Sequence, residues 1–428
     1  MRKFPVLRVR GANNSGQTLL MFVLFIVVLF LFIGLGIDLG FSYITKAQLS
    51  KAVDAAALEG MKTLSQGTIT ATTVASETFA VNYGRPGRDV GAVSPSVVFS
   101  KASNGVNTLL DVKASTTINT FFIRVLPMWK TLAVSSSSEA TRVKLIMTLV
   151  LDRSGSMNAN SPPGSTHGGV YLPGAVTHFI DTFDDTLDEV AMVSFSSTAN
   201  VDVPMSTPFK SAIATAANNL IYYGGTFSVG GLTNALALEN SVDVPVDVDA
   251  TKVVVFFTDG LANMIDDTLS CPPQTTWNFG GYDPPNSGAA FFSPNAPRTR
   301  QGQENASCTI GDNGTPVCCS GGSQFYSQEY NTLENFTRDN ITAESKYRCI
   351  QLANQMRAAN MYVYSIGLGG DPNNPVDFTF LQQVANDPNS LTYNSNEPTG
   401  EALVANDPTE LDSLFQEIAN RILLRLTK

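Results

Sequence analysis

An uncharged apolar run from Leu19 to Ile37 limits what this chain can fold into more than any other feature of its sequence. As a helix, these 19 residues reach about 28 Å, close to the ~30 Å hydrocarbon core of a bilayer. A helix also satisfies its backbone hydrogen bonds internally, as lipid requires. The apolar part of a secretory signal is shorter and ends at a small-residue cleavage site, whereas this run continues into Asp38-Leu39-Gly40-Phe41. We therefore expect a retained transmembrane helix at residues 19–37.

The charges that flank the apolar run predict its orientation. Only four charged residues precede Asp38, and all are basic: Arg2, Lys3, Arg8 and Arg10. Positively charged flanks stay in the cytoplasm. We therefore expect a single-pass membrane protein, with a cytoplasmic basic tail at residues 1–18 and the remaining residues outside the cytoplasm. The remaining 23 basic and 37 acidic residues argue against nucleic acid as a partner.

Five cysteines occur, all in the C-terminal part: Cys271, Cys308, Cys318, Cys319 and Cys349. They lack paired C-x-x-C spacing, which argues against a thiolate zinc site, and an oxidising compartment favours disulfides. Cys349 lies in a predicted helix, and we expect it to bridge to one of the four cysteines before it. Adjacent cysteines such as Cys318 and Cys319 are not expected to pair with each other. The sequence thus predicts two disulfides and one free thiol.

Residues 38–142 are expected to form a helical stalk and a small α+β unit. From Tyr43 to Met61 the sequence is rich in alanine and lacks proline, so the membrane helix is predicted to continue to about residue 62. Its small residues suit close helix packing, although an ordinary stalk would have the same composition. Ser135 to Ser138 fit either a linker or the end of an edge strand. Short strands are predicted at residues 95–99, 108–114 and 132–134.

Residues 143–428 alternate predicted strands and helices, as a doubly wound, mainly parallel α/β domain does. The strands are continuous apolar runs, which indicates burial on both faces: residues 144–151, 253–257 and 361–366. Helical patterns separate them at residues 171–183, 209–220, 231–241 and 342–359. A last helix is predicted from Asp407, with Pro408 at its first position and Glu410 in a capping-box-like spacing.

Oxygen ligands occur at the ends of these strands. Asp152, Ser154 and Ser156 follow the first buried strand, Thr226 lies in a glycine-containing loop, and Asp259 ends another buried strand. Open α/β sheets bind ligands at the carboxyl ends of their strands, and these oxygens suit a hard divalent cation. On their own, the first three residues fit a helix-capping turn better. Together, the three loops predict one cation site.

An insertion at about residues 262–340 follows Asp259 directly and contains four of the cysteines. At about 75 residues it is too long to be a simple connection. It could fold over or beside the cation site and select the partner, or it could be a surface loop that is held by disulfides.

The N-terminal region shows an ordered set of short segments around the apolar run: Gly16-Gln17, Gly36-Ile37-Asp38-Leu39-Gly40, Ala47-Gln48-Leu49 and Ala52-Val53-Asp54-Ala55-Ala56-Ala57-Leu58. In these segments it resembles the membrane-anchored region of TadE/TadG-like proteins of the Flp, or tight-adherence, pilus. It lacks the Glu that processed pilin-like members carry five residues after a Gly cleavage point. The resemblance implies a pilin-like α+β unit after the anchor and a place in a pilus system. It also implies a bacterial cell membrane, with the C-terminal bulk in the periplasm or outside the cell.

The second resemblance rests on Asp152, Ser154, Ser156, Thr226 and Asp259 in that order. With these residues the domain resembles a von Willebrand factor type A domain, a Rossmann-like fold, and its metal-ion-dependent adhesion site. The resemblance implies that the five residues bind Mg²⁺, or another divalent cation such as Mn²⁺ or Ca²⁺, directly or through water. Magnesium keeps waters in its octahedral shell, so a carboxylate from a protein partner could take one position.

We therefore expect a non-enzymatic envelope protein that binds protein partners through the cation, in pilus assembly or surface adhesion. The alternative is a structural pilus or envelope subunit that packs through its N-terminal helix, in which the metal only stabilises the fold. A metallohydrolase ranks third, because hydrolysis generally needs a placed acid or base. The two histidines, His167 in a Pro/Gly/Ser loop and His178 in a helical pattern, fit surface or packing roles better.

Overall fold

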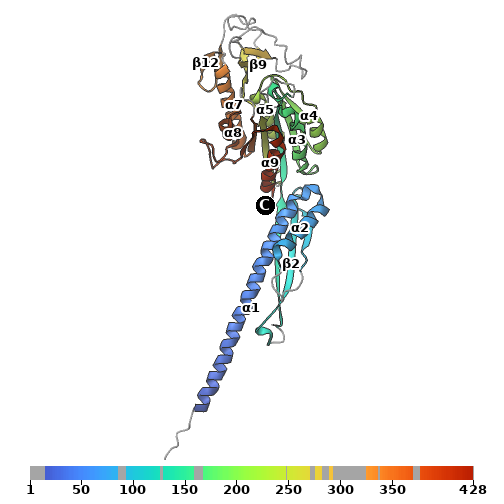
Figure 1. Ribbon diagram of the computed structural model, residues 1–428, viewed down its shortest axis with the longest axis vertical. Helices are drawn as coiled ribbons and strands as arrows, with labels where there is room; N and C mark the ends of the chain where they lie inside the picture. The colour runs from blue at the N-terminus through green and yellow to red at the C-terminus, as the bar shows by residue number, and fades with distance from the viewer. Residues whose placement is uncertain are drawn as a thin grey trace, which may run out of the picture. The chain divides into compact units, whose positions relative to one another are not determined.

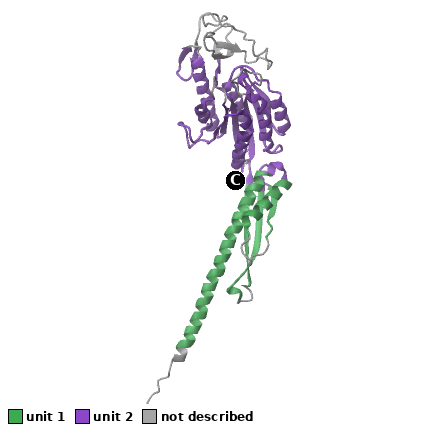
Figure 2. Cartoon of the chain, viewed as in Figure 1, with its two compact units in different colours: residues 1–63, 68–100, 110–140 green, residues 64–67, 101–109, 141–428 purple. Residues whose placement is uncertain are grey.

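The computed structural model describes two compact units, coloured separately in Figure 2. The first comprises residues 1–63, 68–100 and 110–140, and the second residues 64–67, 101–109 and 141–428. The described residues are 15–84, 93–125, 129–158, 167–246, 248–269, 275–281, 289–292, 324–335, 338–369 and 376–427. The basic residues before Ser15 and the cysteines Cys271, Cys308, Cys318 and Cys319 lie outside these ranges.

The long N-terminal helix is continuous, as predicted. Helix α1 runs over Ser15–Lys62 and is drawn in blue in Figure 1. By length and composition it could cross a membrane. Apolar side chains between Leu19 and Ile33 are largely exposed, whereas Leu49, Ala52 and Val53 are buried.

Helix α2, Thr68–Tyr83, packs against the second half of α1 in the same unit. It buries Ala71, Ala75 and Phe79, so small residues on both helices allow the close packing that alanine-rich faces favour. Helix α2 was not among the elements predicted from the sequence.

A three-stranded sheet completes this unit, with β1 (Ser96–Lys101), β2 (Thr108–Asn119) and β3 (Thr131–Arg142) in the order β1-β2-β3. The predicted strands are confirmed, and all three extend beyond their predicted ends. Ser135 to Ser138 lie within the edge strand β3, so their interpretation as a linker is wrong; they belong to an edge strand but do not end it, because β3 continues to Arg142. A 3₁₀ turn at Ile123–Val125 follows β2.

The second unit is built on a six-stranded sheet with the order β14-β13-β7-β4-β5-β6. All neighbouring strands are parallel except β6, which runs antiparallel to β5, so the predicted mainly parallel α/β fold is confirmed. The strand bounds are β4 Lys144–Asp152, β5 Glu189–Phe195, β6 Ala199–Ser206, β7 Ala250–Thr258, β13 Tyr362–Leu368 and β14 Ala402–Ala405.

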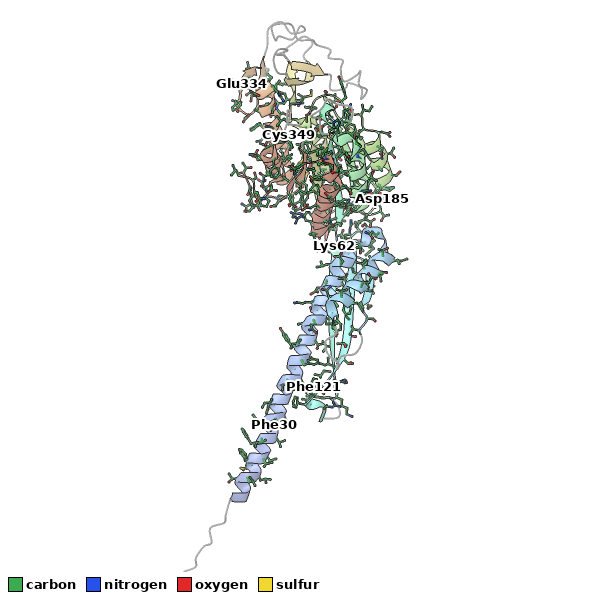
Figure 3. The ribbon with its side chains drawn as sticks, viewed as in Figure 1. Phe30, Lys62, Phe121, Asp185, Glu334 and Cys349 are labelled. Atoms are coloured by element: carbon green, nitrogen blue, oxygen red, sulfur yellow. The ribbon has the colours of Figure 1, made fainter. Side chains whose placement is uncertain are left out.

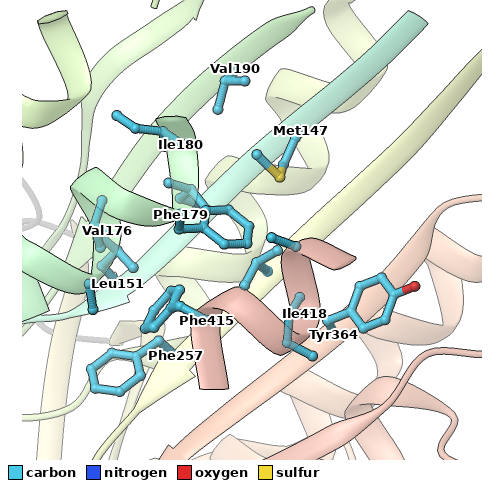
Figure 4. Packing of buried hydrophobic residues seen from close by; sticks show 14 of the residues in the cluster. Met147, Leu151, Val176, Phe179, Ile180, Val190, Phe257, Tyr364, Phe415 and Ile418 are labelled. Carbon is cyan, nitrogen blue, oxygen red and sulfur yellow. The ribbon is translucent and has the colours of Figure 1, made fainter. Parts of the chain in front are cut away.

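Helices cover both faces of this sheet (Figure 1). On one face pack α3 (Leu172–Asp181), α4 (Lys210–Asn218) and α9 (Leu411–Leu426). On the other face pack α5 (Ser228–Ser241), α7 (Arg338–Ala358) and α8 (Phe378–Ala385). Because strand side chains alternate, Leu149 and Leu151 of β4 join the first core and Val150 joins the second. Figure 4 shows Phe179 of α3 and Phe415 of α9 in the first core, with ring centroids 5.6 Å apart.

The last helix begins with the predicted cap. The Asp407 carboxylate accepts a hydrogen bond from the Thr409 backbone N–H at 2.9 Å, and Glu410 accepts one from the Asn406 N–H, also at 2.9 Å. A 3₁₀ turn at Pro408–Glu410 leads into α9. These bonds satisfy backbone donors that have no partner within the helix.

The described part of the insertion consists of short strands. Strands β8 (Met264–Leu269), β9 (Thr275–Gly281) and β10 (Ala289–Phe292) form an antiparallel sheet, and β11 (Gln324–Ser327) pairs with β12 (Thr332–Asn335). Cys349 of α7 is a free thiol buried in the core between α7 and the sheet. The prediction that Cys349 bridges to the insertion is therefore wrong, because its side chain points into the core of the domain.

Candidate metal centre

The candidate site lies where the chain changes direction across the sheet. Strand β4 is followed on one side by β5 and β6 and on the other by β7, β13 and β14, so the switch point falls between β4 and β7. These two strands are parallel, with Leu151 beside Phe257, and their carboxyl ends therefore present Asp152 and Asp259 at the same edge. Ligands of open α/β sheets bind at such a crevice.

Asp152, the last residue of β4, is held by two hydrogen bonds. One carboxylate oxygen accepts the Ser154 backbone N–H at 2.7 Å, and the other accepts the Thr258 hydroxyl at 2.6 Å. The residue is fully buried. The orientation of this carboxylate is thus set by its own loop and by the strand that leads to Asp259.

Three oxygens of the site lie within hydrogen-bonding distance of one another. The Ser154 and Ser156 hydroxyls are 3.0 Å apart. Both donate to the same carboxylate oxygen of Asp259, over 3.3 Å from Ser154 and 2.8 Å from Ser156. The three atoms form a small triangle, with each edge between 2.8 and 3.3 Å.

The loop that carries Thr226 is fixed to both neighbouring loops by its backbone. The Gly224 carbonyl accepts the Gly155 N–H at 2.9 Å. The Thr226 N–H donates to the Asn263 side-chain oxygen at 2.8 Å, and the Asn263 N–H donates back to the Thr226 carbonyl at 3.2 Å. Thr226 is buried, with 2% of its surface exposed. All five predicted residues therefore lie at one edge of the sheet. Thr226 is held there by the backbone contacts of its loop.

The electrostatics of the site favour a cation. Asp152 and Asp259 are both buried, so two carboxylates share a region that water reaches poorly. Burial raises the pKa of the Asp152 carboxyl, even though hydrogen bonds from Ser154 and Thr258 act in the opposite direction. Buried negative charge is costly unless a cation or hydrogen bonds compensate it. The donor set consists of carboxylate and hydroxyl oxygens, which Mg²⁺ and Ca²⁺ prefer over softer ligands.

Sequence reasoning missed the residues that support the site. Thr258 holds Asp152, Asn263 holds the Thr226 loop, and the Ser197 hydroxyl accepts the Gly225 N–H at 2.9 Å. Only Thr258 had a usable signal, because it directly precedes Asp259 at the end of a buried strand. Asn263 and Ser197 are polar residues in loops, and nothing in their local pattern indicates which backbone group they bind.

The insertion begins beside the candidate site. An ideal Cβ at Gly225 would lie 2.4 Å from the Met264 sulfur, so the Thr226 loop lies directly against the side chain of the first residue of β8, which would have to move to admit a larger residue. This contact indicates that the insertion starts next to the site.

His178 lies on α3 and contacts Asp412 of α9 at 2.9 Å.

Two family models match the chain. Residues 16–63 match the model of the putative Flp pilus-assembly TadE/G-like family, and residues 147–261 match that of the von Willebrand factor type A domain. Both resemblances predicted from the sequence are confirmed. No curated protein matches the chain.

Several solved structures are similar at low identity. The pilus adhesin SpaC from Lactobacillus rhamnosus GG is 14% identical with a TM-score of 0.41, and the match covers 78% of this chain but only 35% of SpaC. The von Willebrand factor domain of the type V pili tip protein Mfa5 from Porphyromonas gingivalis is 15% identical with a TM-score of 0.39, covering 67% of this chain and 97% of that one. The PilB minor pilin from Streptococcus sanguinis is 13% identical with a TM-score of 0.41, covering 78% and 79%.

Proposed function

We propose that this chain, which joins a TadE/G-like N-terminal region to a von Willebrand factor type A domain, is a non-enzymatic envelope protein of a Flp pilus system that binds a protein partner through a divalent cation. Helix α1 would cross the cell membrane once, with the basic N-terminal residues in the cytoplasm. The A domain would act in pilus assembly or surface adhesion.

The oxygen triangle of Ser154, Ser156 and Asp259 carries this proposal. Mg²⁺ binds oxygens at about 2.1 Å in an octahedron, so neighbouring ligands lie about 3.0 Å apart. The observed edges of 3.0, 3.3 and 2.8 Å bracket that value. The three oxygens are thus spaced like one face of an octahedral shell. Asp152 and Thr226 would complete the protein ligands, directly or through water.

The chemistry of such an ion supports binding to an acidic partner. Two carboxylates balance the charge of a divalent cation, and neutral hydroxyls leave it electrophilic enough to attract another oxygen ligand. A carboxylate from a partner could replace one of the waters that Mg²⁺ retains. The partner would then be recognised by a Glu or Asp side chain, with affinity that depends on the metal.

Calorimetric titration of Mg²⁺ into the full chain in detergent tests the site, and capture of pilus proteins from the same envelope tests the function. Asp152→Ala and Thr226→Ala should abolish cation-dependent capture, while Asp243→Ala, which removes an exposed carboxylate after α5, should leave capture unchanged. Asp259→Ala should weaken cation affinity by at least about 10–100-fold, because it removes one oxygen of the triangle. Unchanged capture by a folded Asp152→Ala protein would refute the proposed binding mode.

A second candidate function is a structural subunit that assembles through α1. The exposed apolar side chains from Leu19 to Ile33 could pack against other helices as well as against lipid. In that case assembly into the pilus complex would persist in EDTA and in the Asp152→Ala variant.

A further inference from the structure

A carboxylate on α1 holds the end of the β2–β3 hairpin against the helix. The Asp38 side chain accepts the backbone N–H groups of Phe121, Phe122 and Ile123, over 2.7, 3.0 and 2.8 Å. Asp38 is buried, with 2% of its surface exposed. Three N–H donors satisfy a carboxylate that would otherwise be costly to bury, so this contact fixes where along α1 the hairpin ends.

The contact places the hairpin end beside the apolar part of α1. An ideal Cβ at Gly34 would lie 2.3 Å from the Phe122 Cβ, so the absence of a side chain at Gly34 lets Phe122 lie directly on the helix. Gly34 precedes Ile37, the last residue of the apolar run, by three residues, or about 4.5 Å of helix. Phe121 packs edge-on against Phe41, with ring centroids 5.8 Å apart.

Three aromatic side chains at this hairpin end are exposed. Phe121, Phe122 and Trp129 have 48%, 45% and 43% of their surface accessible. The Thr120 hydroxyl donates to the Trp129 carbonyl at 2.7 Å, which closes the hairpin and keeps Trp129 near the two phenylalanines in the chain fold. In Figure 3, Phe121 lies beside α1, and Phe30 lies farther along the helix toward its N-terminus.

Apart from Asp38 of α1, which the hairpin backbone contacts, the charged side chains of the hairpin end itself are basic. Arg124 and Lys130 are exposed, and no acidic residue occurs from Asn119 to Thr131. Aromatic rings together with lysine and arginine are the side chains that membrane proteins place at the level of the lipid headgroups. The hairpin end also continues the exposed apolar surface of α1, where Ile33 and Ile37 are 49% and 48% exposed. An exposed apolar patch of this kind marks an interaction surface.

We propose that the end of the β2–β3 hairpin is a second membrane contact. Phe121, Phe122 and Trp129 would lie in the headgroup region of the bilayer, on the side where the C-terminal half of α1 emerges. This inference rests on the proposed membrane crossing of α1. The occupant of the patch is lipid, and the basic residues fit the phosphate groups of an anionic leaflet. Because Asp38 fixes where the hairpin end meets α1, it sets the depth at which the three aromatic side chains enter the bilayer. The β2–β3 hairpin is thereby held at a fixed distance from the bilayer.

Fluorescence of Trp129 in the full chain tests the proposal. The chain has two tryptophans, so a Trp277→Phe variant reports on Trp129 alone. It would be reconstituted into nanodiscs that contain phosphatidylglycerol, with spin labels on the headgroup or bromine near the upper or lower end of the acyl chain. Headgroup and upper-chain quenchers should quench Trp129 at least about twofold more than the lower-chain quencher, because interfacial aromatics lie at headgroup level.

Two matched variants calibrate depth, each with Trp129→Phe and Trp277→Phe. Phe30→Trp reports from the apolar run, and Tyr43→Trp reports from the helix nine residues beyond Gly34, or about 13.5 Å. Both positions are exposed, at 64% and 75%, so tryptophan fits without disturbing packing. Quenching of Trp129 no stronger than that of Tyr43→Trp, with Phe30→Trp strongly quenched, would overturn the hairpin contact and leave the anchor standing. Absence of quenching at Phe30→Trp would overturn both.

A variant without the Asp38 carboxylate tests whether Asp38 sets the depth of the hairpin end, because the aromatic side chains are kept. Asp38→Ala in the Trp277→Phe background should reduce headgroup quenching of Trp129 by roughly half or more, because three backbone donors lose their acceptor. Asp54→Ala, an exposed carboxylate on the same helix, should leave it unchanged. Equal quenching of Trp129 in the Asp38→Ala and parent proteins would contradict the role of Asp38.

Discussion

Thr258 shows how one uncharged side chain can orient a candidate metal ligand without belonging to the proposed ligand set. Its hydroxyl donates to the Asp152 oxygen that does not accept the Ser154 N–H, so each oxygen of this carboxylate has a fixed partner. Such supporting hydrogen bonds keep a ligand in the orientation that the metal requires. The effect of Thr258 on cation binding should therefore be large for a residue outside the ligand set.

We expect Thr258→Val to weaken Mg²⁺ affinity by about 10–100-fold, since valine keeps the volume and removes the hydroxyl. Calorimetric titration of the full chain gives the affinity directly. Thr251→Val, at the start of the same strand, is the control and should bind Mg²⁺ as the parent does. Equal affinities for the two variants would show that Asp152 needs no partner from β7.

Glu239 is a buried acid on the face of the sheet opposite α3 and α9. It lies on α5, where it accepts the Thr148 hydroxyl at 2.8 Å with one carboxyl oxygen. Its other oxygen is buried without a hydrogen-bond partner in the structure. Burial raises the pKa of Glu239 from 4.5 to about 8, and the nearby Lys252 only partly offsets this effect.

The raised pKa of Glu239 makes stability depend on pH. The folded protein keeps this proton up to about pH 8, whereas the unfolded chain releases it near pH 4.5. The folded state thus binds more protons between these values, and its contribution to the free energy of unfolding falls as pH rises from 4.5 to 8.

Glu239→Gln should remove this dependence and stabilise the protein by about 1–3 kcal/mol at pH 8, with little gain at pH 5. Chemical denaturation at several pH values measures the difference between parent and variant. Asp243→Asn, which neutralises an exposed carboxylate just after α5, should leave the pH profile parallel to that of the parent. A difference between Glu239→Gln and parent that is constant from pH 5 to 8 would contradict the raised pKa.

At the scale of elements, a buried ion pair joins Arg142, the residue that ends β3, to Asp188, which directly precedes β5. The Arg142 guanidinium donates to both oxygens of Asp188, over 3.0 and 2.6 Å. The same carboxylate accepts the Leu145 N–H at 3.0 Å and the Asp184 N–H at 2.8 Å. Asp188 thereby connects Leu145 at the start of β4, Asp184 in the α3–β5 loop and Arg142 at the end of β3.

Asp188→Ala should destabilise the second unit by about 3–5 kcal/mol, because it leaves the Arg142 charge buried without its partner. The adjacent Glu189→Ala is the matched control. Its carboxylate pairs with Lys144 at 2.6 Å, but both side chains are partly exposed, at 27% and 22%, so the cost should stay below about 1 kcal/mol. Urea denaturation of both variants makes the comparison. Equal losses of unfolding free energy in the two variants would mean that burial does not determine how strongly the Arg142–Asp188 pair stabilises the protein.

At the scale of the whole molecule, the proposed topology decides which parts meet a partner. If α1 crosses the membrane once, the second unit and the part of the first unit beyond about Asp38 lie on the outer side, and the basic N-terminal residues remain inside. Protease added to spheroplasts should then degrade everything beyond about Asp38, as detected with a C-terminal tag, while a cytoplasmic marker stays intact. Protection of the Asp152 region would reverse the orientation.

The same topology places all cysteines in an oxidising compartment. Cys349 is buried and free, and burial raises the pKa of its thiol well above the usual range, so it should resist alkylation in the folded protein. Mass spectrometry of protein purified from its own envelope should find one thiol, that of Cys349, labelled only after denaturation. The other four cysteines are expected to form two disulfides. Five free thiols would contradict both the disulfides and the compartment.

Much of this protein could be predicted from local sequence alone. The membrane-length helix follows from one uncharged run, the strands β4, β7 and β13 from continuous apolar segments, and the candidate ligands from oxygen-bearing residues at strand ends. Each signal is contained within a few adjacent residues, because helix and strand periods and the solvation of side chains are local properties. The family resemblances added the expected use of the ligands.

Only the tertiary structure decided how distant residues meet. Asp38 reaches the N–H of Phe121, 83 residues later, and Asp152 reaches Thr258, 106 residues later. Cys349 could be expected to face a disulfide partner, yet the packing of α7 on the sheet directs it into the core. Such contacts depend on which elements pack together, and a buried polar group accepts whichever donor that packing supplies. The sequence alone therefore determined the most apolar elements and the candidate ligands, and long-range packing decided which side chains position them.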